Sequence, residues 1–445
     1  MKLRPYLLPA LLLLTGTLAQ TLAGLNWHLA IPAWIAPLLL LRYSRTVKWS
    51  GMLPLLLLLI VAGAVSQTGN KLFSLPGINL ANGLTFGLLT LVFYLPDKLL
   101  YGGGQRFYKT LIFPSTVAIT EYLVSQRFGT WGIIAHTQYA FKPLLQLAWL
   151  TGPHGISFLV AWFASVANWA WEHREERKKV IKASVIYGSI LVAVILYGSL
   201  RLLQHRPQEQ PVPAAMVSGV TDLHGLVERE MENFKALSAN GSLELPRRIF
   251  SGRDKLDTML LRTEKALNGG SRIIVWSESA LILNREGKDS LLRELGLLAQ
   301  NYNAWLLPAF LAQSDSGPKP FDNLAVLLGP DGKTVFTYKK SFLHPYAEAP
   351  VMNAGNFVLP FADTEYGRIA VAICADLDLP GYMKQLRENQ VDLLLAPSYD
   401  WPGIDPLHAH MAVLTVITNG SGLMRANGRG IELSCDRIGI TKHIP

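Results

Sequence analysis

Charged residues and cysteines are both scarce in this chain of 445 residues. Only 16% of the residues are Asp, Glu, Lys or Arg, where soluble domains usually have about a quarter. The two cysteines, Cys374 and Cys435, are far apart, and no CxxC or Cys/His spacing occurs. We therefore expect no disulfide framework, no metal site and no cofactor.

The deficit of charge is confined to the first half of the chain. Long uncharged runs fill residues 1–205, whereas residues 206–445 have the mixed composition of a soluble domain. We predict a transmembrane domain of about seven helices over 1–205, a polar linker over 206–213 and a second domain over 214–445. The apolar stretches that carry this prediction are 5–22, 25–42, 51–67, 79–97, 109–126, 152–172 and 181–203.

Loops rich in basic residues alternate with loops poor in them along the first half of the chain. These loops hold much of the basic excess, so the net charge of +9 does not require a nucleic-acid partner. The N-terminus and the loops after the second, fourth and sixth stretches hold Lys2, Arg4, Arg42, Arg45, Lys48, Lys98, Arg106, Lys109, Arg174, Arg177, Lys178, Lys179 and Lys182. The remaining loops hold only Lys71, Arg127 and Lys142. Because cytoplasmic loops are rich in Lys and Arg, the N-terminus is predicted to be cytoplasmic and residue 206 onward external.

The second half alternates short apolar runs with amphipathic segments. Strands are predicted over 214–218, 272–276, 304–309, 323–328, 334–338, 368–373 and 391–396. Helices are predicted over 226–238, 254–267, 288–301, 380–389 and 406–417. Interleaved strands and helices indicate a layered α/β domain.

Three of these strands end at residues with suggestive side chains. Glu278 follows one, Lys339 or Lys340 follows another, and Cys374 follows a third. A carboxylate can accept the thiol proton, a thiolate can attack a carbonyl, and an ammonium can stabilise the resulting oxyanion. Each residue also has an ordinary explanation, such as a buried core cysteine, a helix cap or a solvated lysine.

The ordered set of motifs resembles the nitrilase superfamily, whose triad runs Glu, Lys, Cys along the chain. Segment 275–280, VWSESA, resembles the V/I-W-P-E-S-A of the apolipoprotein N-acyltransferase family, and segment 338–350, YKKSFLHPYAEAP, resembles its Y-x-K-x-x-L-x-P-F-G-E-x-x-P. Segment 373–376, ICAD, is similar to its I-C-Y-E. The expected architecture is a polytopic helical membrane domain followed by a nitrilase-like αββα sandwich.

The resemblance implies a role for each site residue. Glu278 falls on the general base, Lys340 rather than Lys339 on the oxyanion-stabilising lysine, and Cys374 on the nucleophile. Glu348 and Asp376 fall on supporting carboxylates. The implied reaction moves an acyl chain from a phospholipid, through a thioester, to the amine of a diacylated lipoprotein. The implied location is a bacterial inner membrane, with the catalytic domain in contact with the bilayer and on the periplasmic or extracellular side.

Several positions depart from the family pattern. Ala375 replaces a tyrosine, Asp376 replaces a glutamate, and Thr415 and Thr418 stand where an arginine and a glutamate are usual. Val227 lies near the place of a family tryptophan. Family members also usually continue into an eighth membrane helix, so either a truncated chain or a shortened relative is expected. These differences leave two alternatives open: an amidase or acyltransferase of the same fold with another acceptor, and a non-catalytic lipid-binding relative. A transporter is disfavoured, because the apolar stretches hold few charges.

Overall fold

The computed structural model describes residues 4–67, 76–102, 106–205, 212–219, 247–345, 348–400, 403–429 and 432–442. It divides into two compact units, residues 1–205 and 206–445. The predicted helix over 226–238, the position of Val227 and most of the predicted linker lie outside the described residues. Each unit is described by itself below.

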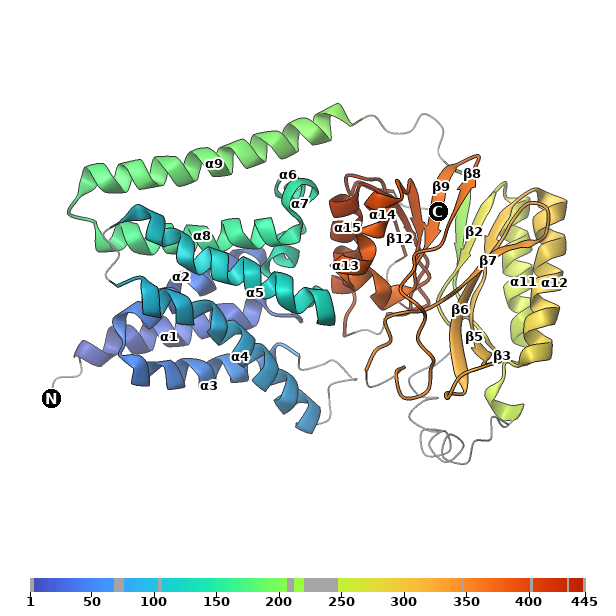
Figure 1. Ribbon diagram of the computed structural model, residues 1–445, viewed down its shortest axis with the longest axis horizontal. Coiled ribbons are helices and arrows are strands. Elements are labelled where there is room, and N and C mark those ends of the chain that lie inside the picture. The colour runs from blue at the N-terminus through green and yellow to red at the C-terminus, as the bar shows by residue number, and fades with distance from the viewer. Residues whose placement is uncertain are drawn as a thin grey trace. The chain divides into compact units, whose positions relative to one another are not determined.

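The first unit is helical (Figure 1). Its longer helices are α1 (Arg4–Ala23), α2 (Ala30–Thr46), α3 (Met52–Val65), α4 (Pro76–Leu100), α5 (Ile112–Phe128), α8 (Pro153–Glu172) and α9 (Arg177–Gln204). Two one-turn helices, α6 (Lys142–Leu145) and α7 (Ala148–Thr151), and three 3-10 turns, Trp49–Gly51, Phe107–Leu111 and Ile134–Gln138, connect them. Each of the seven predicted apolar stretches therefore coincides with a helix.

Not all of these helices are long enough to cross a bilayer. Among the described residues, Tyr6–Ala23, Leu80–Leu100 and Arg177–Gln204 are long and apolar enough. Lys142–Thr151 and Pro153–Glu172, bent by 117°, would make a fourth if counted together. Helices α2 and α5 have 17 residues each, fewer than the ~20 that span the hydrocarbon. Length and composition thus support at most four of the seven predicted spans.

The C-terminal ends of α2, α4 and α8 meet in a charged cluster. Arg45 at the end of α2 bonds both carboxylate oxygens of Asp97 at 2.9 Å, and this pair is buried. Arg42 lies 3.0 Å from Glu172 of α8, and Lys98 donates to the carbonyl of Ser44 at 2.6 Å. The ends that carry the predicted basic loops are therefore on one side of this unit.

The second unit contains two sheets. The seven-stranded sheet has the order β1-β2-β4-β6-β5-β3, with β7 paired to β6, and the six-stranded sheet has the order β13-β12-β11-β10-β9-β8. Their strands are β1 (Ala214–Val217), β2 (Ile273–Trp276), β3 (Ile282–Leu283), β4 (Trp305–Leu307), β5 (Ala309–Gln313), β6 (Phe321–Leu328), β7 (Thr334–Lys339), β8 (Phe361–Thr364), β9 (Gly367–Val371), β10 (Leu393–Leu395), β11 (Gly422–Arg425), β12 (Leu433–Cys435) and β13 (Thr441–Lys442). The helices are α11 (Arg253–Asn268), α12 (Arg285–Tyr302), α13 (Pro380–Met383), α14 (Gln385–Glu388) and α15 (Leu407–Asn419), with 3-10 turns at Arg247–Ile249 and Cys374–Asp378.

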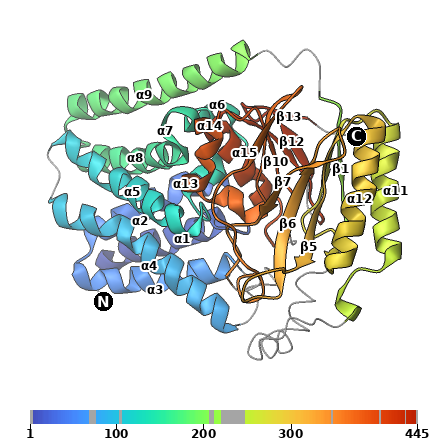
Figure 2. The ribbon, with the colours of Figure 1, turned by 45° about the vertical axis from the view of Figure 1, so that its right-hand side comes forward.

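These elements form four layers (Figures 1 and 2). Helices α11 and α12 cover the outer face of the seven-stranded sheet, α13, α14 and α15 cover that of the six-stranded sheet, and the two sheets face each other. The strands at the centre are buried on both faces, as the fully buried run of β6 illustrates. This is the αββα sandwich that the motif resemblance implied.

The local differences from the predicted elements have simple causes. The predicted strand 304–309 is two strands, because Pro308 has no N–H to continue the ladder. The predicted helix 380–389 is broken into α13 and α14 at Lys384. Strands β3, β8, β11, β12 and β13 were not predicted, since runs of two to four residues carry little periodicity.

Candidate active site

Three polar side chains follow the carboxyl ends of strands. Glu278 comes two residues after β2, Lys340 directly follows β7, and Cys374 opens the 3-10 turn after β9. The first two belong to the seven-stranded sheet and the third to the six-stranded sheet. All three side chains are buried, so each needs a partner for its polar group.

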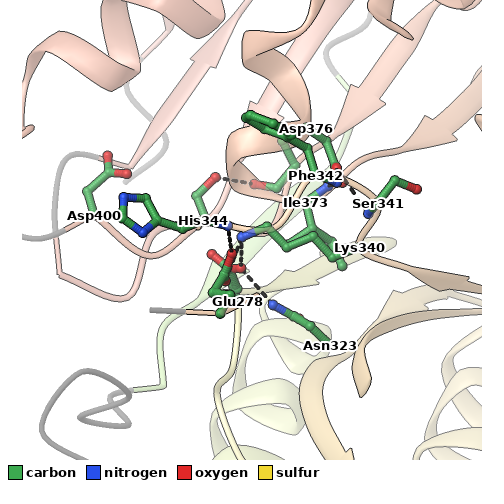
Figure 3. A network of polar contacts seen from close by, with 12 residues as sticks. Glu278, Asn323, Lys340, Ser341, Phe342, His344, Ile373, Asp376 and Asp400 are labelled. Atoms are coloured by element: carbon green, nitrogen blue, oxygen red, sulfur yellow. Dashed lines mark hydrogen bonds and ion pairs between the residues drawn. The ribbon is translucent and has the colours of Figure 1, made fainter. Parts of the chain in front are cut away.

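Lys340 joins two glutamates (Figure 3). Its Nζ donates to Glu278 Oε1 at 2.8 Å and to Glu348 Oε1 at 2.7 Å. Asn323 Nδ2, from β6, donates to the same Glu278 oxygen at 2.8 Å. Glu348 Oε2 accepts from the backbone N–H of His344 at 2.8 Å. The structure therefore brings together Glu278, Lys340 and Glu348, three of the predicted site residues.

The two glutamates have opposite tendencies to ionise. Burial raises the pKa of Glu278, and repulsion from Glu348 adds to the rise. Burial also opposes ionisation of Glu348, but Lys340 and the backbone N–H of His344 outweigh it and lower the pKa of Glu348. Burial alone would lower the pKa of Lys340, yet attraction to both glutamates holds it well above its usual range. Glu278 is thus the carboxylate that takes up a proton most readily.

Cys374 has an unusual backbone and close charged neighbours. Its φ of 50° lies in the left-handed region, which is strained for a residue with a Cβ. Its own N–H is bonded to the carbonyl of Pro397 at 2.9 Å. The charges of Glu278 and Lys340 both act on the thiol electrostatically. Burial raises the pKa of the thiol, and the charge of Glu278 raises it further.

Asp376 connects the turn of Cys374 to the segment after Lys340. Its Oδ1 accepts from the N–H groups of Ser341 and Phe342 at 3.1 and 2.7 Å. Its Oδ2 accepts from the N–H of Ile373 at 2.9 Å and from the Tyr338 hydroxyl at 2.7 Å. Burial raises the pKa of Asp376 to about 6. The carboxylate thus links the turn after β9 to the segment after β7.

A second buried cluster near Cys374 was missed in the sequence. It consists of Asp378, Asp400, His408 and Arg425. Cys374, Asp400 and His408 each place a polar atom within 4.8 Å of the others. Little in the sequence indicates this cluster, because its residues are scattered between positions 378 and 425 and share no motif spacing.

The hydroxyls of the two threonines that replace the family's arginine and glutamate in α15 donate hydrogen bonds to backbone carbonyls. Thr415 donates to the carbonyl of Leu377 at 3.1 Å, and Thr418 donates within its own helix to Leu414 at 2.7 Å. Trp401, another position in this region, lies outside the described residues. The altered helix therefore still contacts the turn that begins at Cys374, through a hydroxyl instead of a charge.

Comparisons with known proteins cover both units. Residues 10–166 match the family model described as apolipoprotein N-acyltransferase N-terminal domain, and residues 245–439 match carbon-nitrogen hydrolase. An apolipoprotein N-acyltransferase of Geobacter metallireducens is 26% identical over 69% of this chain and 60% of that protein. One of Photobacterium profundum is 30% identical over 40% of each chain. A NitN amidase from Nesterenkonia sp. AN1 is 17% identical, with a TM-score of 0.38, over 42% of this chain and 81% of that chain.

Over residues 245–439 the α/β unit is similar to the carbon-nitrogen hydrolases, and its sandwich is the nitrilase-like fold. Since both matched families and the curated relatives agree, the chain is a diverged relative of the apolipoprotein N-acyltransferases. The aligned residues span 60% and 62% of the lengths of two such relatives, from Geobacter metallireducens and Rickettsia prowazekii.

Proposed function

We propose that this protein is a membrane N-acyltransferase that moves an acyl chain from a phospholipid to the amine of a diacylated lipoprotein. Cys374 is the nucleophile, Glu278 the general base and Lys340 the oxyanion-stabilising cation. The observation that carries the proposal is the buried Glu278–Lys340–Glu348 network, whose Glu278 and Lys340 interact electrostatically with the buried thiol of Cys374. The names of the curated relatives supply the N-acylation of an apolipoprotein, and the motif resemblance implies the phospholipid donor and the diacylated acceptor.

In the first half-reaction the thiol becomes acylated. Glu278 accepts the proton of Cys374, and the thiolate attacks an ester carbonyl of the phospholipid. Lys340 has three N–H groups, and two of them are used by Glu278 and Glu348, so the third can donate to the oxyanion. The C–O bond then breaks, Glu278 returns the proton to the glycerol oxygen, and a lysophospholipid leaves.

In the second half-reaction the acyl chain passes to nitrogen. The neutral α-amine of the diacylglyceryl-cysteine attacks the thioester, and Glu278 accepts the proton that the nitrogen loses. The C–S bond breaks, the thiolate regains that proton, and the product is an amide. Glu278 can act as the base in both half-reactions. Burial favours its protonated, uncharged form, so the carboxylate takes up a proton readily in each of them.

The helical unit supports a membrane location. Large apolar side chains of α9 are exposed on its surface, including Val192 at 54%, Leu196 at 57% and Leu203 at 81%. Contiguous exposed apolar surface of this kind is unusual for a protein surrounded by water. We propose that these helices lie in an inner membrane, with the charged ends of α2, α4 and α8 toward the cytoplasm and the α/β unit periplasmic or extracellular.

A labelling experiment tests the acyltransferase. The full chain is incubated in detergent or vesicles with phospholipid carrying a labelled acyl chain, and the protein is digested for mass spectrometry. The expected result is a hydroxylamine-sensitive acyl group on Cys374 that disappears when a diacylated lipopeptide is added. Cys435→Ser is the matched control, since it removes the other cysteine and is expected to label normally.

Each outcome decides between the candidate functions. An acylated Cys374 that passes its chain only to other amines would favour a different acceptor, as in an amidase or acyltransferase of the same fold. If folded protein forms no adduct on Cys374 with any phospholipid, both enzymatic functions are ruled out. The non-catalytic lipid-binding function then remains.

A further inference from the structure

The second charged cluster lies on the six-stranded-sheet side of the catalytic turn. Asp378 ends the 3-10 turn that begins at Cys374, Asp400 follows β10, His408 is in the first turn of α15, and Arg425 ends β11. All four side chains are buried. A polar atom of Cys374 lies within 4.8 Å of polar atoms of Asp400 and His408, so the cluster is close enough to act on the thiol.

His408 is held between two carboxylates. Its Nδ1 lies 2.7 Å from Asp400 Oδ1, and its Nε2 lies 3.2 Å from Asp378 Oδ1. Two carboxylates at these distances favour the positively charged ring. Burial would lower the pKa of His408, but attraction to the two aspartates holds it well above its usual range.

Arg425 fixes Asp400 in place. Its Nη2 lies 2.7 Å from each oxygen of Asp400 and 3.1 Å from His408 Nδ1. Asn427 Nδ2 donates to Asp400 Oδ2 at 2.9 Å. The guanidinium therefore occupies the place next to Asp400 and His408 that a metal ion would need, although Cys374, Asp400 and His408 are residue types that bind metals. The cluster supplies its own cations.

The charges around Cys374 show why a second cation is useful. The charges of Glu278, Lys340 and His408 all act on the thiol, and a ring nitrogen of His408 lies within 4.8 Å of its sulfur. Lys340 is already shared by two glutamates. A thiolate beside that network would add a negative charge to a site whose carboxylates outnumber its ammonium. His408 is the nearest additional positive charge.

We propose that His408 is a second catalytic cation, an imidazolium fixed by Asp378 and Asp400 that stabilises the thiolate of Cys374. Asp378, Asp400 and Arg425 are positioning residues. This inference rests on Cys374 being the nucleophile but not on which acyl donor or acceptor it uses.

The test measures the thiol itself. In the full chain carrying Cys435→Ser, the rate of Cys374 alkylation by iodoacetamide is followed from pH 5 to pH 11 by mass spectrometry. An opposite charge within about 4–6 Å moves a pKa by about 1–3 units. In His408→Gln the midpoint of the profile is therefore expected at least about one unit higher, with alkylation at pH 7 slower by about tenfold. His410→Gln, on the same helix, is the matched control and should keep the parent profile.

Two further arms keep the result decisive. Asp378→Asn leaves the ring in place but removes one of the two negative charges beside it, so a smaller shift in the same direction is expected, and this variant decides the result if His408→Gln does not fold. A chelator should change neither profile, whereas a chelator effect would show that a metal binds at Cys374. An unshifted midpoint in folded His408→Gln and Asp378→Asn, or a parent thiol without a titration in this range, would overturn the inference. Failure of phospholipid labelling with a shifted midpoint would instead overturn only the proposed substrates.

Discussion

Two charged clusters contact Cys374, and they differ in their balance of charge. The cluster from the seven-stranded sheet has two carboxylates and one ammonium, in Glu278, Glu348 and Lys340. The cluster from the six-stranded sheet has two carboxylates and two cations, in Asp378, Asp400, His408 and Arg425. An excess carboxylate in a buried site holds a proton easily, whereas a balanced set does not. The first cluster therefore suits proton transfer, and the second suits a fixed electrostatic field.

The largest effect is expected from the thiol that both clusters contact. Cys374→Ala removes the nucleophile, so acyl transfer to a lipopeptide should fall by at least about 10⁴-fold. Neither cluster loses a charged member, so the melting temperature should change little. The measurement is single-turnover transfer from labelled phospholipid, with Cys435→Ser as the control. Activity retained in Cys374→Ala would mean that neither cluster serves a thioester.

Breaking the proton-transfer cluster should cost both activity and stability. Lys340→Met leaves Glu278 and Glu348 side by side without their shared ammonium. Loss of an oxyanion donor typically lowers kcat by about 10²–10³-fold, and removing one member of a buried ion pair costs about 3–5 kcal/mol. Transfer kinetics and thermal unfolding, measured on the same samples, check the two effects. A fully stable variant with lost activity would indicate that the glutamates share a proton in place of the lysine.

Breaking the balanced cluster should affect stability more than activity. Asp400→Asn leaves two buried cations, His408 and Arg425, without their common carboxylate. The expected loss of stability is again about 3–5 kcal/mol, while activity should fall by about 10–100-fold because Asp400 acts through His408. If the variant lost activity as completely as Cys374→Ala does, Asp400 would have to touch the reacting atoms, and the contrast between the clusters would fail.

Asp376 links the turn after β9 to the segment after β7. Its titration predicts how the stability of the protein depends on pH. Burial raises its folded pKa to about 6 from an ordinary 3.8. Between these values the unfolded chain has already lost the proton that the folded protein keeps, so this group's contribution to stability falls as the pH rises from 4 to 6. Asp376→Asn cannot titrate, and its four donors lose an acceptor.

The variant should therefore be less stable than the parent protein, with a deficit that narrows by up to about 3 kcal/mol between pH 4 and pH 6. Melting temperatures of the two proteins across this range measure the deficit. A deficit that widens with pH would show that the four hydrogen bonds outweigh burial and that the pKa of Asp376 is not raised.

The same contrast separates what the sequence could predict from what it could not. The first cluster was predictable, because Glu278, Lys340 and Glu348 lie in contiguous motifs at the ends of strands. The second was not, because it brings together the ends of a turn, two strands and a helix from positions that share no spacing. The eight-residue strand β6 was predictable from its apolar run, whereas the two-residue strand β3 depends on its pairing with β5, which is distant in sequence.

The smallest effect is expected at the lysine next to the catalytic one. Lys339 Nζ lies 2.9 Å from Asp322 Oδ1, and its side chain is 30% exposed, whereas the side chain of Lys340 is 2% exposed. A solvated ion pair contributes about 0–1 kcal/mol, and Asp322 keeps hydrogen bonds from Ser314 and Asn353. Lys339→Met should therefore lose less than about 1 kcal/mol of stability and leave transfer within about twofold of the parent protein. Adjacent positions, the same substitution and the same assays make it the matched partner of Lys340→Met. Equal losses in the two variants would mean that the ammonium beside Cys374 has no special role, and the assignment of Lys340 from its motif spacing would be wrong.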